Sequence, residues 1–207
     1  MTAEHVLQEV ATRVVVLRTP AVVGVDGPDG AGKSTIADAL AGTLRDAGSR
    51  VVRASADDFH HPRAHRHAEG RTHETVWLRH FDIEALLREL LNPWRAGAGA
   101  EYRRRWHDLA TDRPVRDPRE TVPQDAILVV DGLFLHRHEL RAAWDLTVYL
   151  DVPDDVGMAR VIARDGPLDD PERYVGAQKI YRAECEPREH AGVVIDNTDP
   201  QEPMIVD

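Results

Sequence analysis

Cysteine is almost absent from this sequence, because Cys185 is the only one among 207 residues. A single cysteine cannot form a disulfide within the chain, and it excludes zinc sites built from several cysteines. Long apolar runs are also missing, since Arg18 and Pro20 interrupt the longest candidate, and we therefore expect no membrane span. Basic residues are scarce, with 26 Lys and Arg against 36 Asp and Glu and a formal net charge of −10. This balance argues against binding nucleic acid or anionic lipid through general charge.

The first residues of the chain do not form a basic segment followed by an apolar one. Glu4 and Glu9 come early, so the sequence predicts no secretion signal and a cytoplasmic location. The remaining composition, with 42% hydrophobic and 30% charged residues, is typical of a globular protein. We expect one domain over residues 1–207, with an N-terminal helix at about 4–17 that Pro20 ends.

Short valine-rich runs alternate with segments of helical periodicity along the chain. The predicted strands are 21–26, 50–55, 126–130, 146–150 and 193–196. The predicted helices after the first one are 36–48, 81–91 with Pro93 as its stop, 138–144, 154–164 and 172–184. Strands that alternate with helices indicate a three-layer α/β fold with a parallel sheet. Residues 59–80 and 92–123 show little periodicity, and we interpret them as loops or short hairpins over the functional face.

A glycine-rich segment joins the first strand to the helix that follows it. Residues 27–34 read Gly-Pro-Asp-Gly-Ala-Gly-Lys-Ser, which matches the phosphate-loop pattern in the strand-to-helix context that the pattern requires. Glycines let backbone N–H groups curve around a phosphate, and the helix dipole adds positive potential. We expect Lys33 to reach the β- and γ-phosphates of a nucleoside triphosphate and Ser34 to ligate Mg²⁺. The predicted nucleotide-binding residues are Gly27, Asp29, Gly30, Ala31, Gly32, Lys33, Ser34 and Thr35.

Three aspartates follow predicted strands at the edge of the sheet where the phosphate loop lies. Asp57 and Asp58 come after strand 50–55, and Asp131 comes after strand 126–130. Groups beyond the carboxyl ends of parallel strands face the ligand crevice. We interpret Asp57 as the carboxylate that takes the proton of an acceptor hydroxyl, and Asp58 as a substrate contact. Asp131 is predicted to hold magnesium together with Ser34 and Asp57, although an aspartate in any of these positions could instead cap a turn.

The segment after Asp58 is crowded with histidine and arginine. We interpret His60 and Arg63 as acceptor contacts because they follow Asp57 closely, and titrating histidines would make acceptor binding sensitive to pH. The alternative is a zinc site of His61, His65 and His67, which the neighbouring cations oppose.

Five segments occur in a fixed order: residues 27–34, Ala-Asp-Asp-Phe-His at 56–60, Val-Val-Asp-Gly-Leu-Phe-Leu at 129–135, Trp-Asp-Leu at 144–146 and Arg-Val-Ile-Ala-Arg-Asp at 160–165. Over about residues 20–197 this order resembles the uridine kinase branch of the phosphoribulokinase/uridine kinase group. The resemblance implies a P-loop NTPase fold of the nucleoside-kinase type, with a parallel five-stranded sheet and a mobile helical lid at about 158–175. It also implies ATP or GTP as the phosphate donor, Mg²⁺, and a 5′-hydroxyl as the acceptor.

Matching positions assign roles to individual residues within this resemblance. Asp57 takes the place of the general base, and Arg160 and Arg164 take the places of lid arginines that close over the phosphates. Their spacing of four residues also puts the two arginines on one face of the predicted helix. Together with Lys33 they are the predicted catalytic residues.

The sequence departs from this family where the nucleoside would bind. Uridine kinases usually carry Tyr-Asp-Phe and a following His, whereas this chain has His107-Asp108-Leu109 and Asp112, with His107 as the predicted substrate contact. Uridine or cytidine is the first acceptor candidate, and another alcohol such as a sugar or a vitamin-like compound is the alternative. A nucleotide-dependent regulatory module without acceptor chemistry is the alternative class. We expect no nucleic-acid or membrane partner, and assembly of identical chains stays open.

Overall fold

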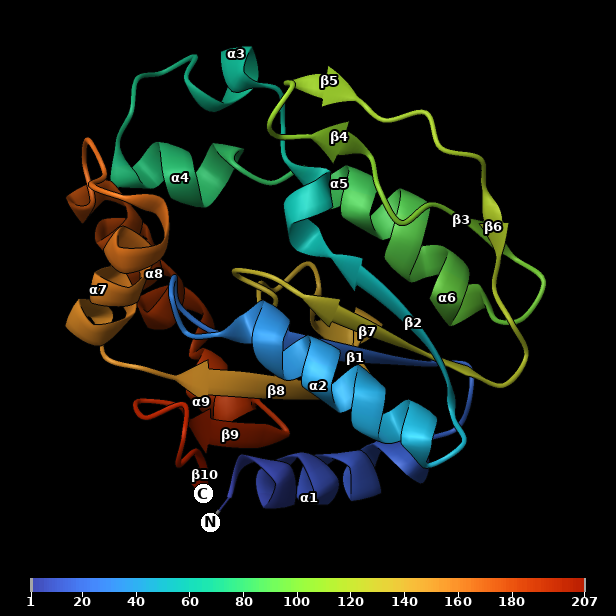
Figure 1. Ribbon diagram of the computed structural model, residues 1–207. Helices are drawn as coiled ribbons and strands as arrows, with labels where there is room; N and C mark the ends of the chain where they lie inside the picture. The colour runs from blue at the N-terminus through green and yellow to red at the C-terminus, as the bar shows by residue number, and fades with distance from the viewer. Residues whose placement is uncertain (1, 207) are drawn as a thin grey trace.

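A six-stranded sheet forms the centre of the protein, shown in Figure 1 for a computed structural model that describes residues 2–206. The strand order is β10-β9-β8-β1-β7-β2. The strands are β1 (Ala21–Asp26), β2 (Arg50–Ser55), β7 (Ala126–Asp131), β8 (Leu146–Asp151), β9 (Val193–Asp196) and β10 (Met204–Val206). The first five run parallel, as predicted. The sheet also has the antiparallel edge strand β10, which was not predicted because only three residues form it and none is fully buried.

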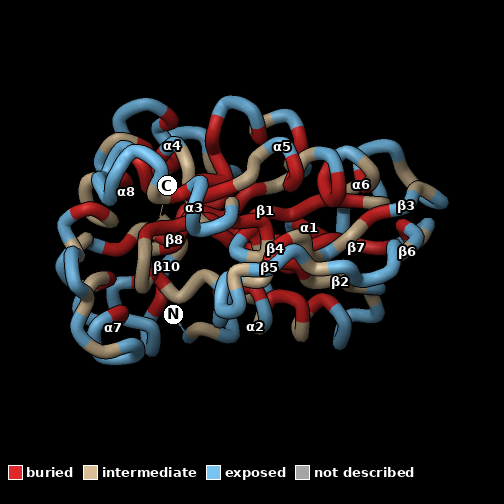
Figure 2. The backbone as a smooth tube through the Cα atoms, turned by 90° about the horizontal axis from the view of Figure 1, so that it is seen from above, coloured by how far each residue is buried: buried red, intermediate tan, exposed pale blue. Residues whose placement is uncertain are grey.

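The central strands are buried on both faces because helices cover both sides of the sheet. Figure 2 shows β1 and β7 as buried segments within a more exposed shell. Along β1 and β7, Val23 and Val129 face α1 (Ala3–Val15) and α2 (Lys33–Asp46). Val22 and Leu128 face the opposite core, which includes residues of α8 (Glu172–Cys185). This alternation explains why the strands read as continuous apolar runs.

The helix predicted at 81–91 continues beyond Pro93, which corrects the prediction of a stop there. It comprises α5 (Ile83–Ala85), a π-helical stretch η2 (Leu86–Leu91) and α6 (Asn92–Ala96). Proline has no N–H to donate to the carbonyl of Glu89, and that carbonyl instead accepts from the backbone N–H of Arg103 at 2.8 Å. Wider π-helical winding before the proline lets the helix run on to Gly97, whose φ of 100° ends it.

Other elements differ from the predictions mainly at their ends. The N-terminal helix begins at Ala3 and ends at Val15, two residues before the predicted end. Only one 3₁₀ turn, η3 (Arg141–Ala143), forms in the predicted helix 138–144. Helix α7 (Asp154–Asp165) and α8 match their predicted ranges closely, and the short helix α9 (Pro187–His190) follows them. Within residues 2–206, no helix combines the length and the apolar character needed to span a membrane.

The two segments expected to be loops or hairpins lie over the sheet beside β2 (Figure 1). Residues 59–80 lie toward the carboxyl ends of the strands, whereas residues 92–123 extend toward the opposite ends. The first contains the 3₁₀ turn η1 (Ala56–Phe59) and the helices α3 (Arg63–Arg66) and α4 (His73–Arg79). The second contains two antiparallel pairs, β3 (Glu101–Tyr102) with β6 (Glu120–Thr121) and β4 (His107–Asp108) with β5 (Arg113–Pro114). Helix α4 packs against α8, so these additions enclose space above the sheet.

Candidate active site

The phosphate loop bends tightly between β1 and α2. Gly30 and Gly32 have φ values of 71° and 88°, in the left-handed region that favours glycine. Gly32 is the N-cap of α2 and makes no side-chain hydrogen bond. The backbone N–H groups of the first helical turn are therefore not capped by a side chain. Lys33 Nζ donates to the carbonyl of Pro28 at 2.7 Å, which folds its ammonium back over the loop. The loop therefore presents positive potential where a phosphate chain would lie.

Ser34 and Asp131 meet at the start of α2. The Ser34 hydroxyl donates to Asp131 Oδ2 at 2.6 Å, and Asp131 is 2% exposed. Arg53 on β2 holds the other oxygen of Asp131, with Nη2 at 2.8 Å. A hydroxyl and a carboxylate placed together offer the hard oxygen ligands that Mg²⁺ prefers, so the residues present fit this ion. Arg53 was not predicted, since an arginine inside a strand gives no signal of its partner.

A cavity of about 260 Å³ extends from the phosphate loop toward α4 and α8. We call it the Asp57 cleft. Its polar and charged lining residues are Asp29, Asp57, His60, Arg66, His80, Arg164, Asp165 and Tyr174. Phe81, Leu133 and Met158 are among its apolar lining residues. The cleft thus joins a residue of the phosphate loop, Asp29, to the predicted base, Asp57.

Asp57 stands in the η1 turn directly after β2. Its backbone N–H donates to the Ser55 hydroxyl at 3.3 Å, and its carboxylate is accessible to solvent. Desolvation by the surrounding protein atoms raises the pKa of Asp57 above its ordinary value, and the charge of Asp131 raises it further, while Lys33 and Arg164 act in the opposite direction. A carboxylate with a raised pKa is a stronger proton acceptor, provided that it is ionised.

His60 and His80 do not titrate near neutral pH, which corrects the expectation of pH-sensitive histidines here. Burial lowers the pKa of His60 to about 4 and that of His80 to about 3. Because neutral His60 lies with Nδ1 2.7 Å from the carbonyl of Asp57, Nδ1 carries the proton and donates it there. The Nε2 atom of His60 is then an acceptor.

Three predicted substrate contacts lie outside the cleft. Asp58 accepts from Arg105 Nε at 3.1 Å in a separate cavity beside β2. The backbone N–H of Arg63 donates to Asp112 at 2.8 Å, and Arg66, one helical turn later, lines the cleft in its place. His107 is 3% exposed, with Nε2 3.4 Å from Asp112. Asp58 and Arg63 lie 47 and 49 residues from their partners, so the sequence gave no signal of these two contacts.

The two predicted lid arginines have different surroundings. Arg160 donates to the carbonyls of Gly30, Asn197 and Thr198 at 3.3, 3.1 and 2.7 Å. These bonds tie α7 to the phosphate loop and to the segment after β9. Arg164 lines the cleft and pairs with Asp165, with Nη2 to Oδ2 at 2.6 Å. Of the two, Arg164 is therefore the one that faces the cleft.

Contact between α7 and the phosphate loop is close. A Cβ atom at Gly30 would collide with the carbonyl oxygen of Gly157, and a Cβ atom at Gly157 would collide with that of Asp29. Asn197, which was not predicted, adds a hydrogen bond from Nδ2 to the carbonyl of Ala31 at 2.7 Å. The loop is thus held from α7 and from the end of β9 as well as from its own strand and helix.

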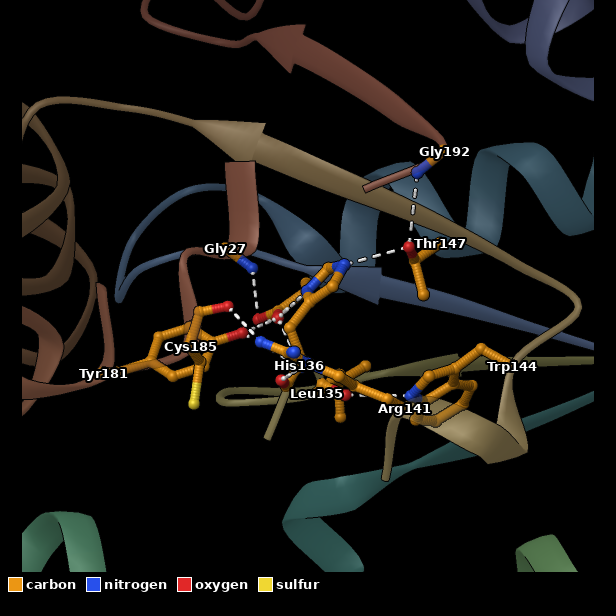
Figure 3. Close-up of polar contacts among 10 residues, drawn as sticks. Gly27, Leu135, His136, Arg141, Trp144, Thr147, Tyr181, Cys185 and Gly192 are labelled. Carbon is orange, nitrogen blue, oxygen red and sulfur yellow. Dashed lines mark hydrogen bonds and ion pairs between the residues drawn. The ribbon is translucent and has the colours of Figure 1, made fainter. Parts of the chain in front are cut away.

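A buried polar network lies beneath the loop (Figure 3). Asp26, which is fully buried, accepts from the backbone N–H of Gly27 at 2.7 Å and from His136 Nδ1 at 2.7 Å. The Tyr181 hydroxyl of α8 donates to the same carboxylate, and His136 Nε2 lies 2.9 Å from the Thr147 hydroxyl. Neither Tyr181 nor His136 was predicted as a site residue from the sequence. Together these bonds fix the first residue of the phosphate loop.

Comparison with known proteins agrees with this geometry. Residues 22–167 match the Phosphoribulokinase / Uridine kinase family. A uridine kinase of Streptococcus uberis is 30% identical over 153 residues, covering 72% of this chain and 69% of that protein. A uridine kinase of Lactiplantibacillus plantarum is 24% identical over 155 residues, with the same shares covered.

Solved structures show the same fold. A possible uridine kinase from Bacillus stearothermophilus has a TM-score of 0.72 at 27% identity, covering 92% of this chain and 97% of that one. A phosphoribulokinase from Rhodobacter spheroides, with a TM-score of 0.60 at 14% identity, covers 87% and 71% and shows the fold alone. With a mostly parallel sheet, a phosphate loop and a family match over most of its length, this chain belongs to the phosphoribulokinase/uridine kinase family of P-loop kinases.

Proposed function

We propose that this protein transfers the γ-phosphoryl group of ATP to a hydroxyl group of a small molecule bound in the Asp57 cleft. The observation that carries the proposal is that one cleft contains both a residue of the phosphate loop and the Asp57 carboxylate. The charge of Lys33, in the same loop as Asp29, also lowers the pKa of Asp57. A regulatory module has no need of a carboxylate at this place.

The chemistry follows from these positions. The acceptor oxygen attacks the γ-phosphorus, the bond from that phosphorus to the β–γ bridging oxygen breaks, and ADP leaves. Asp57 takes the hydroxyl proton, while Lys33 and the loop N–H groups stabilise negative charge on the transferring group. Ser34 and Asp131 would hold Mg²⁺, which supplies further charge neutralisation when bound. Arg164, which lines the same cleft, adds positive charge beside these phosphates, and the predicted lid excludes water.

Uridine and cytidine are the first acceptors to test, because the curated relatives are uridine kinases. Other small alcohols belong in the same panel, because His107, Asp108 and Asp112, which replace usual nucleoside contacts, do not line the cleft, and Leu109, which does line it, is apolar. GTP should be compared with ATP as the donor.

An Asp57→Asn variant tests the role of the base. We expect acceptor-dependent turnover to fall by about 10² to 10⁴-fold, the usual contribution of a general base, with the affinity for ATP nearly unchanged. Asp58→Asn is the matched control, because it changes a neighbouring carboxylate that pairs with Arg105 outside the cleft. Rates from an ADP-release assay and ATP affinity from titration calorimetry give the two readouts. Equal losses in the two variants, or loss of ATP binding in Asp57→Asn, would refute the assignment.

A further inference from the structure

Two buried arginines on different elements lie at the Asp57 cleft or next to one of its lining residues. Arg66 of α3 lines the cleft and is 9% exposed, and Arg173 of α8 is 8% exposed. Arg173 Nη2 donates to the hydroxyl of Tyr174 at 2.6 Å, and Tyr174 lines the same cleft. His80 also lines the cleft, and its ring lies 6.3 Å from that of Tyr174. We call Arg66, Arg173 and His80 the Arg66 cluster.

Neither arginine has the carboxylate partner that a buried guanidinium group usually has. Within residues 2–206, no Asp or Glu oxygen lies within 4.0 Å of the side-chain nitrogens of Arg66 or Arg173. Arg66 makes one side-chain hydrogen bond, from Nε to the carbonyl of His61 at 3.0 Å. The Nε and Nη1 atoms of Arg173 are buried without any hydrogen-bond partner. Buried charges are strongly unfavourable unless they are paired, so this arrangement calls for an anion from outside the chain.

The Arg66 cluster and the reacting groups come from different elements, since Arg66 and Arg173 lie on α3 and α8 whereas Asp57 stands in η1. The charges that act most on Asp57 belong to Lys33, Asp131 and Arg164. Those that act most on Arg66 belong to Asp112, Arg63, Tyr174 and Arg173, and Asp112 lies beyond ion-pair distance. His80 is neutral near pH 7 and therefore leaves the positive charge of the arginines uncompensated. A molecule in the cleft would thus meet both the Asp57 carboxylate and the Arg66 guanidinium group.

We propose that the acceptor is an alcohol that also bears an anionic group, either a carboxylate or a phosphate monoester, and that Arg66 binds this group in the field of Arg173. The proposal rests on the proposed function, because it places the hydroxyl of the same molecule at Asp57. A guanidinium group presents paired N–H donors that match both kinds of anion. An uncharged nucleoside would leave both arginines unpaired.

Matched pairs of alcohols that differ in an anionic group test the proposal directly. ATP consumption is measured with glycerol and glycerate, ribose and ribose 5-phosphate, panthenol and pantothenate, and with uridine. We expect at least one anionic member to exceed its neutral partner tenfold or more in kcat/KM. The carboxylate and phosphate arms show which anion the cluster takes.

Arginine variants connect that preference to the cluster. We expect Arg66→Gln and Arg173→Gln to raise the KM for the anionic acceptor at least tenfold while the KM for ATP stays within twofold. Arg71→Gln is the matched control, because Arg71 is an arginine of the neighbouring segment whose side chain is 49% exposed. Circular dichroism checks folding, and Arg66→Lys, which keeps the charge, should restore part of the affinity.

Binding without turnover separates this proposal from the proposed function. Equilibrium dialysis of the anionic compounds, with a non-hydrolysable ATP analogue present, should show binding that Arg66→Gln weakens. Phosphorylation of uridine alone, with an unchanged KM in Arg66→Gln, would overturn the anionic acceptor and leave the kinase assignment intact. Anion binding without any acceptor-stimulated ATP consumption would support the cluster and count against phosphoryl transfer. Absence of binding by every anion would overturn the proposal.

Discussion

At the scale of single residues, the structure separates Asp57 from Asp58, which adjoin in sequence. The η1 turn directs Asp57 into the cleft and leaves Asp58 paired with Arg105 on the other side. The sequence could place both after β2, and the position of the phosphate loop favoured Asp57. The sequence could not single out Arg66 or Arg173. These residues stand out because no carboxylate pairs with them in the fold, and a sequence does not show which side chains will be paired.

The raised pKa of Asp57 predicts how the rate depends on pH. A base must be ionised, so acceptor-dependent kcat/KM should fall as the pH drops through a pKa that lies above the ordinary value of 3.8. Arg164 lowers this pKa, and Arg164→Gln should therefore move the acidic limb to higher pH. Profiles of kcat/KM against pH for the two proteins check this. Arg164 is not among the groups that act most on His60, so an unmoved limb would point to His60 and away from Asp57.

At the scale of elements, the close contact between α7 and the phosphate loop requires glycine at position 157 of α7. Replacing a helical glycine by alanine usually stabilises a helix by about 0.5–1 kcal/mol. We expect this gain for Gly42→Ala in α2, where a Cβ atom would meet nothing within 4 Å.

Gly157→Ala should behave in the opposite way, because its Cβ atom would collide with the carbonyl of Asp29. The loop would have to shift, so we expect ATP affinity to fall about tenfold or more, which corresponds to about 1.4 kcal/mol. Calorimetric titration with ATP and thermal melting measure both variants. Unchanged ATP affinity in Gly157→Ala would show that the loop tolerates the shift.

At the scale of the whole molecule, two apolar cores on opposite faces of the sheet meet the buried network of Asp26, His136 and Tyr181. The burial of β1 and β7 on both faces could be predicted from their continuous apolar runs, which are typical of strands that helices cover on both sides. The network could not, because His136 is separated from Asp26 by 110 residues and only the fold brings them together. The edge strand β10 was not predicted, because a pattern of alternating apolar and polar residues cannot be recognised over three partly exposed residues.

Removal of one hydroxyl from this network should lower the stability of the entire domain. In Tyr181→Phe the buried carboxylate of Asp26 loses a donor, and we expect the free energy of unfolding to fall by about 1–3 kcal/mol. Tyr102→Phe, whose hydroxyl reaches the partly exposed Glu120, is the matched control with a smaller expected loss. Urea denaturation followed by circular dichroism compares them, and equal losses would contradict a special role for the network.

The collision geometry of Gly30 and Gly157 also limits how this enzyme can open and shut. The first two turns of α7 cannot pivot away as a rigid arm without dragging the nucleotide cradle, since Arg160 fastens them to it. We therefore expect the predicted lid to hinge farther along the chain, near Gly166, which has a φ of 85°. In that case the lid would move without moving the phosphate loop, and the acceptor could exchange while the nucleotide stays bound.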